Sequence, residues 1–277
     1  MSKKSKKKTL RPAEKAPPAP LPAASRPIPP LWGDDALSQF LQVAHENSFF
    51  VFTQHRRVYD LVALTHEAFD VLVGLAASSS PKYLSFFVAR AHSAYLASLR
   101  LALAGEVAES FAPLRVSIET AWYGLHVSAD PDATKRMQSW LSRDDNEQAK
   151  WDVVKLFRSG DLKRTHQDKD PETAKILEHL YERCISYGAH PNPAGLLTNM
   201  IREEDHRSIT HKVLYLNAQV MPLMFALKTC VEVAVGIVRV FGLVYPKQYV
   251  ASGMLQRLEA LVSTLNVVFQ PYTPRAR

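Results

Sequence analysis

The chain has 277 residues, of which 47% are apolar and 22% are charged, which is enough apolar sequence for a sizeable core. Its net charge of +7 comes from residues 1–30, with eight basic residues and one acidic; residues 31–277 carry 26 of each sign. A neutral body lacks the broad positive field of a dedicated duplex-binding domain. Cys184 and Cys230 form no CxxC pair, so the sequence excludes a disulfide framework and predicts buried thiols in a reducing compartment.

Residues 1–30 are predicted to form a disordered basic arm. They contain eight prolines and almost no large apolar residue before Leu31. No apolar core follows the lysines, so the arm is not a secretory signal, and we expect a cytoplasmic protein. The arm either keeps the chain soluble or contacts an anionic surface, nucleic acid included, or serves as a nuclear-type basic address.

From Asp34 onward, apolar residues recur at helical spacing, and Asp34 or Asp35 can cap the first helix. This pattern predicts a single all-α bundle of seven to nine helices in residues 31–277. Beyond the first helix, the predicted helical segments are 54–77, 81–104, the stretch between Gly105 and Ala129, 132–158, 171 to about 188, 217–244 and 247–269.

The remaining segments are predicted to be irregular. Residues 160–170 read as a charged loop with an exposed His166, and residues 192–207 as a charged connection. The weak alternation in residues 209–216 fits either a short strand or an extended lead-in.

The segment 217–244 is the most apolar part of the chain, and Pro222 is a possible kink in it. Lys228, Glu232 and Arg239 interrupt it, so no window of 18 residues is both apolar and free of charge. The sequence therefore favours a buried core helix and predicts no transmembrane span.

The helix after Gly105 is expected to carry a polar group beside its apolar face. Arg115 and Glu119 lie four residues apart and can pair. The pair is either a surface pair or part of a polar cluster inside the bundle. The expected apolar stripe consists of Phe111, Leu114, Ile118, Ala121 and Leu125, and the polar flank also includes Trp122 and His126.

The stretch 182–193 concentrates the most chemistry. It contains Arg183, Ser186, Tyr187 and His190 close to a predicted helix end. Pro191 favours an extended backbone for the residue before it, which places His190 just past that end. In the alternative interpretation, His190 only caps the helix and Tyr187 only packs in the core.

Cofactor and metal signals are missing from the sequence. There is no glycine-rich loop before a helix, no HExxH and no paired-carboxylate repeat, and no two histidines are spaced i,i+4. We therefore expect neither a cofactor nor a metal.

Two blocks carry a resemblance to a known family. Arg115-Val-Ser-Ile-Glu119, followed by an aromatic-rich helix and Asp130-Pro131, resembles the "R..iE" helix of an uncharacterised bacterial all-helical family. The block from Tyr181 to Pro191 resembles that family's later "Y..lS.y.Hp" segment. The resemblance spans about residues 45–245 and rests on these two blocks.

The second block also resembles the Arg-x(4–6)-His motif of the HEPN superfamily, whose members are helical and often dimeric. The resemblance implies a metal-independent endoribonuclease of a bacterial defence or toxin–antitoxin type. Arg183 would bind the scissile phosphate of RNA and His190 would act as general acid or base, supported by Ser186 and Tyr187 from the same segment. Arg115 and Glu119 would support them from across the bundle, with Glu119 holding an arginine by charge-assisted hydrogen bonds.

The motif departs from the family pattern in two respects. Six residues separate Arg183 from His190, at the long end of the family's range, and Cys184 follows the arginine where a polar residue is usual. The resemblance also implies a homodimer or a protein partner. The alternative function is a non-catalytic helical interaction or scaffold protein, which the neutral body favours.

Overall fold

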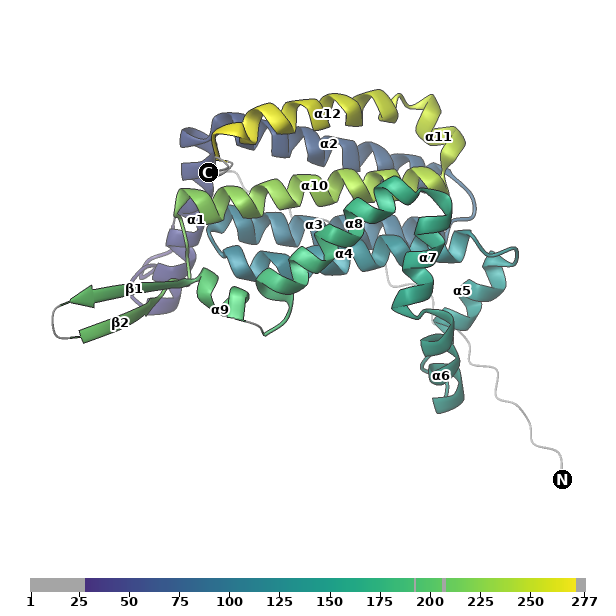
Figure 1. Cartoon of the computed structure of the whole chain (residues 1–277), viewed down its shortest axis with the longest axis horizontal. Coiled ribbons are helices and arrows are strands. Elements are labelled where there is room, and N and C mark those ends of the chain that lie inside the picture. Colours follow the sequence, from purple (N-terminus) through teal and green to yellow (C-terminus); the bar gives the residue numbers. More distant parts are fainter. Residues whose placement is uncertain (1–27, 192, 206–207, 273–277) are drawn as a thin grey trace. The chain divides into compact units, whose positions relative to one another are not determined.

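The computed structural model describes residues 28–191, 193–205 and 208–272 of the chain. Nearly all of its regular structure is helical (Figure 1), and nine of the α-helices in these ranges have ten or more residues, which confirms the predicted all-α bundle. Residues 1–27 of the predicted disordered arm lie outside the described residues. The elements are α1 (Ala36–Gln54), α2 (Arg56–Ser78), α3 (Leu84–Ala104), α4 (Val107–Ser128), α5 (Ala133–Leu141), α6 (Glu147–Leu156), α7 (Ser159–Lys169), α8 (Pro171–Cys184), η1 (Ile185–Ala189), α9 (Pro193–Thr198), β1 (Met200–Asp205), β2 (Ser208–Val213), α10 (Val220–Val244), α11 (Pro246–Ala251), α12 (Met254–Phe269) and η2 (Gln270–Tyr272).

The described residues divide into two compact units, one that ends at Gln39 and one that begins at Phe40. The described part of the first unit is residues 28–39. Within it, Asp35 caps α1, because its Oδ1 accepts hydrogen bonds from the backbone N–H groups of Leu37 and Ser38 at 2.9 and 3.0 Å. A hydrogen bond from the Ser38 hydroxyl to the Asp35 carboxylate, together with these backbone bonds, lowers the pKa of Asp35. The predicted cap is therefore confirmed at the second of the two aspartates.

The core of residues 40–277 is built around α10, which packs against α2, α3, α4 and α8 (Figure 1). By length and composition, α2 and α10 are both apolar enough to cross a membrane, and 67% of the most apolar window of α10 is buried among the other helices. That burial is what the sequence predicted for a core helix. Pro222 lies in the first turn of α10, where its missing N–H is not needed, so it does not kink the helix.

The apolar stripe predicted on α4 is confirmed. Every member of the stripe is buried, and the helix lies between α3 and α10. Gly105 ends α3 with a φ of 91°, a left-handed conformation that glycine adopts without strain, and so turns the chain back into α4. The α3–α4 hairpin carries two of the six predicted site residues, Arg115 and Glu119, both on α4.

Two predictions between residues 132 and 170 are wrong. The single helix expected at 132–158 is divided into α5 and α6, because Asn146 accepts the backbone N–H of Ala149 at 2.9 Å and starts a new helix. The charged loop expected at 160–170 is helix α7. His166 is 1% exposed there, and its Nδ1 accepts a hydrogen bond from the indole N–H of Trp122 at 3.1 Å. Burial lowers the pKa of His166 to about 4, so its ring is neutral.

The segment from residue 192 to 216 is more regular than predicted. Residue 192 and residues 206–207 lie outside the described part, but α9 and an antiparallel hairpin occupy much of the rest. Met200 pairs with Val213 and Asp205 with Ser208. The alternation that began at residue 209 therefore belongs to a strand, β2, and not to an extended lead-in. The third predicted helix also starts later than Pro81, since α3 begins at Leu84.

Candidate functional site

Glu119 of α4 joins the two sequence blocks on which the predicted site depends. Its Oε1 accepts a hydrogen bond from the Arg115 guanidinium and another from the Tyr181 hydroxyl of α8, each at 2.9 Å. The Arg115 guanidinium also lies 5.4 Å from the centroid of the Tyr181 ring. These three residues, which we call the Glu119 cluster, tie α4 to α8. The expected arginine partner of Glu119 is therefore Arg115, on the same helix.

Tyr181 and Arg115 keep their protons near neutral pH. Burial and the adjacent Glu119 raise the pKa of Tyr181 to about 12. Burial lowers the pKa of Arg115, but the hydrogen bond and charge of Glu119 outweigh it and raise the pKa overall. The phenol therefore stays protonated and the guanidinium charged, so neither is suited to proton transfer near neutrality.

Lys163 of α7 extends the Glu119 cluster. Its ammonium lies 2.9 Å from Glu178 and 3.4 Å from Glu182 of α8, and 5.0 Å from the centroid of the Tyr181 ring. These contacts connect α7 to α8 through charge and through a cation–π interaction. Lys163 is thus a structural clamp and not a cation available for a phosphate.

Arg183 contacts α10. Its Nη1 donates to the Glu232 carboxylate at 2.5 Å and to the Thr229 hydroxyl at 3.2 Å, and its guanidinium lies 5.4 Å from the centroid of the Phe225 ring. The side chains of Arg183 and Glu232 are 19% and 23% exposed. The cation that the resemblance assigns to a scissile phosphate is therefore already neutralised by a carboxylate.

The residues after Arg183 divide between the core and the surface. The Tyr187 ring packs 5.9 Å from Phe111 and 4.8 Å from Phe225, between centroids, whereas Ser186 is exposed. Tyr187 therefore packs against the core, as the alternative interpretation predicted.

His190 lies just past the end of the π-helical turn η1, in an extended conformation with φ −143° and ψ 146°, as the following proline predicted. It is exposed and lines an open hollow of about 310 Å³ together with Glu109 and Gly188. Among the described residues, no hydrogen bond or ion pair joins His190 to Arg183. The structure thus places these two residues in different surroundings, Arg183 against α10 and His190 beside the start of α4.

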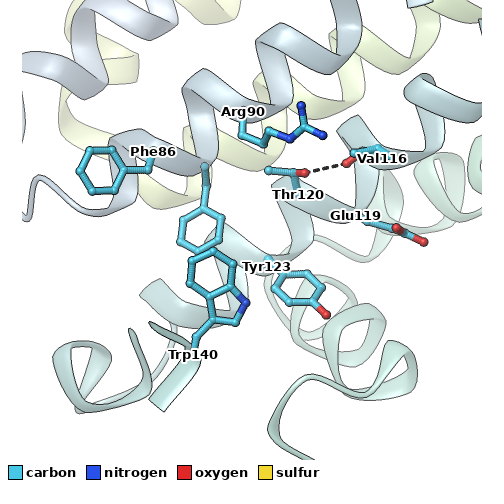
Figure 2. Close-up of a pocket in the computed structure, with 8 residues that line it drawn as sticks. Phe86, Arg90, Val116, Glu119, Thr120, Tyr123 and Trp140 are labelled. Carbon is cyan, nitrogen blue, oxygen red and sulfur yellow. Dashed lines mark hydrogen bonds between the residues drawn. The ribbon is translucent and has the colours of Figure 1, made fainter. Parts of the chain in front are cut away.

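A second, larger pocket is lined in part by Glu119 and was not predicted (Figure 2). It has a volume of about 470 Å³ and is lined from α3, α4 and α5. The Phe87 and Trp140 rings, 5.3 Å apart between centroids, form part of its wall. The lining residues are Phe86, Phe87, Arg90, Val116, Glu119, Thr120, Tyr123 and Trp140.

The polar groups of this pocket differ in whether they are already paired. Glu119 is engaged within the Glu119 cluster, and the Thr120 hydroxyl donates to the Val116 carbonyl at 2.7 Å. Arg90 makes no ion pair or side-chain hydrogen bond with the described residues, and in Figure 2 its guanidinium extends over Thr120. Burial and the nearby Glu119 raise the pKa of Tyr123, so its phenol is a neutral donor. The unpaired charge of the pocket is therefore positive.

The two cysteines are confirmed as buried thiols. Burial raises the pKa of Cys184 to about 12 and that of Cys230 to about 11. Neither forms a thiolate near neutral pH, so neither is a nucleophile or a ready metal ligand.

The fold and these sites define the class of protein: an all-α bundle with a part-buried polar cluster between α4 and α8 and an aromatic pocket that shares Glu119 with that cluster. Comparison with protein-family models, with curated proteins and with solved structures found no match for the chain.

Proposed function

We propose that the protein is a non-catalytic helical interaction protein whose recognition site is the pocket between α3, α4 and α5. One observation carries the proposal: in the described chain, the pocket presents an unpaired guanidinium, Arg90, above aromatic walls, while its carboxylate, Glu119, is already neutralised. An aromatic group that bears a negative charge matches both features, with its ring against the walls and its charge at Arg90.

The size and rigidity of the pocket support this ligand class. A volume of about 470 Å³ falls within the range of about 300–1,000 Å³ that is typical of small-ligand sites. The Tyr123 ring stacks on Phe157 at 4.9 Å between centroids, and Phe87 is buried, so these walls are held in place before a ligand arrives. Preformed aromatic walls are also what the anchor residue of a protein partner requires.

The proposed role of the pocket is binding and not catalysis, because none of its lining groups is suited to proton transfer near neutral pH. Tyr123 has a raised pKa, Glu119 is held by two donors, and Arg90 stays charged. Neither His190 nor Arg183 lines this pocket.

The test uses the fluorescent aromatic anion anilinonaphthalene sulfonate as the probe. We expect the folded chain to bind it, and Arg90→Gln to weaken that binding at least about fivefold, because a charge-assisted hydrogen bond contributes about 1.5–3 kcal/mol, part of which is lost to solvent screening at an exposed site. Arg100→Gln, on the same helix and outside the pocket, is the matched control and should bind like the parent.

Because this probe also binds partly unfolded chains, each variant must first show the parent's near-ultraviolet circular dichroism and thermal unfolding. If Arg90→Gln binds the probe as tightly as the parent, or if Arg100→Gln weakens binding as much as Arg90→Gln does, Arg90 is not part of the recognition site. Trp140→Leu should also weaken binding, because it takes away one aromatic wall.

The second candidate function is the metal-independent endoribonuclease implied by the HEPN resemblance. The exposed ring of His190 beside an open hollow supports it, because that imidazole can reach a substrate. The pairing of Arg183 with Glu232 weighs against it, since a phosphate would have to displace the carboxylate.

An RNA-cleavage assay in the presence of a chelator separates the two candidates. Under the interaction proposal, the parent cleaves no faster than a buffer control, and Arg183→Ala and His190→Ala do not differ from it. Cleavage by the parent that falls at least about a hundredfold in either variant, with thermal stability kept, would instead favour the nuclease.

A further inference from the structure

Three side chains with metal-ligating atoms gather where α2 meets α3. His66 and Asp70 are four residues apart on α2 and so share one face of that helix, and His92 reaches them from α3. His66 Nδ1 lies 3.2 Å from His92 Nε2, and Asp70 Oδ1 lies 3.9 Å from the same His92 nitrogen. With one ligand atom taken from each residue, all three lie within 4.8 Å of one another.

These separations can be compared with those of a zinc site. Zinc binds imidazole nitrogen and carboxylate oxygen at about 2.0–2.2 Å in tetrahedral geometry, which puts neighbouring ligand atoms about 3.3–3.5 Å apart. The observed 3.2 and 3.9 Å lie on either side of that value, and the third separation, between His66 and Asp70, is at most 4.8 Å. Side-chain shifts of up to about an ångström would therefore bring the three ligand atoms to zinc-binding distances. From this geometry we infer that His66, Asp70 and His92 form a zinc-binding site that joins α2 to α3.

The surroundings of His92 favour a prepared ligand. Its ring stacks on Phe69 with 4.9 Å between centroids and 9° between planes, and its side chain is 12% exposed, so its orientation is fixed by packing.

The charge of Asp70 provides an independent argument. Among the described residues, its carboxylate is paired with no lysine or arginine and contacts only the two imidazoles, His66 at 3.4 Å and His92 at 3.9 Å. A hydrogen bond between the two rings satisfies one nitrogen of each and leaves that negative charge uncompensated. A divalent cation bound to all three residues would compensate it.

The three ligand residues also indicate which cation would bind and whether the site would be closed or open. Two imidazoles and one carboxylate suit zinc, whereas magnesium and calcium prefer oxygen ligands alone. With His66 39% and Asp70 59% exposed, a fourth position remains open to water or to a donor from another molecule. Because two ligands come from α2 and the third from α3, the ion would hold the two helices together at this point.

The experiment titrates zinc ions into the full chain, without an affinity tag, by isothermal calorimetry. We expect about one zinc ion per chain, and at least about tenfold weaker binding in Asp70→Asn and in His66→Gln, since each removes a direct ligand. His179→Gln is the matched control, because His179 is an exposed histidine on α8 outside the cluster. It should bind zinc like the parent.

Thermal unfolding provides a second readout that does not depend on calorimetry. Zinc should raise the Tm of the parent and of His179→Gln, and should raise it much less in Asp70→Asn. Asp70 is largely exposed, so its substitution should leave the fold intact, which circular dichroism can verify. No zinc binding by the parent, or binding that is equal in the parent and a His66→Gln/Asp70→Asn double variant, would overturn the site.

Discussion

Replacing Gly188 with alanine is expected to destabilise the folded chain by about 3 kcal/mol, because the added methyl group overlaps backbone that cannot rotate away. A Cβ at this position would lie 1.8 Å from the carbonyl oxygen of Ala108 and 2.7 Å from its carbonyl carbon. The φ of Gly188 is 174°, an extended value that alanine adopts, so the effect is steric. Either η1 moves away from α4 or the overlap remains.

The matched control is Gly160→Ala. Gly160 lies in α7, and a Cβ there meets no atom within 4 Å. We expect this change to be neutral or to stabilise by up to about 1 kcal/mol, because alanine loses less backbone entropy on folding. Urea unfolding monitored by circular dichroism measures both variants. A Gly188→Ala midpoint equal to that of the parent would show that the approach of η1 to α4 is not close.

The sequence predicted well whatever depends on one helix at a time. The stripe from Phe111 to Leu125 follows from a repeat of three and four residues, and its members are all buried. The pair of Arg115 and Glu119 follows from i,i+4 spacing and forms at 2.9 Å. In both cases the geometry of a single helix decides the result.

Contacts between helices could not be predicted in the same way. Tyr181 reaches Glu119 across 62 residues of sequence, and Arg183 reaches Glu232 across 49. Nothing in one sequence tells which helix packs against α8, so Arg183 was expected to face Glu119. The pocket was missed for the same reason, since its walls come from three helices.

Two further features were not predicted, although residues in the sequence indicate them. Asn146, an amide side chain suited to capping, stands in a polar run and could have divided the helix predicted at 132–158. His66 and Asp70 at i,i+4 are also a possible ligand pair, although they are a histidine with an aspartate and not two histidines at that spacing. The third member, His92, lies 26 residues from His66 in sequence, and only the packing of α3 on α2 brings it close.

A double-mutant cycle on Arg183 and Glu232 is expected to give a coupling energy of about 1–2 kcal/mol, because the pair is mostly shielded from solvent and hydrogen-bonded. The two side chains are 19% and 23% exposed, and their atoms are 2.5 Å apart. Glu232→Gln alone should cost about 1–3 kcal/mol, since it leaves a partly buried guanidinium without its counter-ion. Thermal and urea unfolding of Arg183→Met, Glu232→Gln and the double variant supply the cycle.

The control cycle uses Arg56 and Asp60, a hydrogen-bonded pair at 2.8 Å whose side chains are 56% and 50% exposed. Solvent screening should keep its coupling below about 0.5 kcal/mol. Equal coupling in the two cycles would mean that Arg183 contributes nothing special to the packing of α8 on α10.

Glu232→Gln also tests the role of Arg183 in RNA binding. If Arg183 holds a phosphate, the removal of its competing carboxylate should strengthen RNA binding and make that binding more sensitive to salt. If Arg183 is structural, as its contacts with Glu232, Thr229 and Phe225 indicate, the variant should lose stability while RNA binding stays at the parent's level. We expect the second result, because a guanidinium that bonds to two side chains of α10 and packs over Phe225 is placed to join two helices.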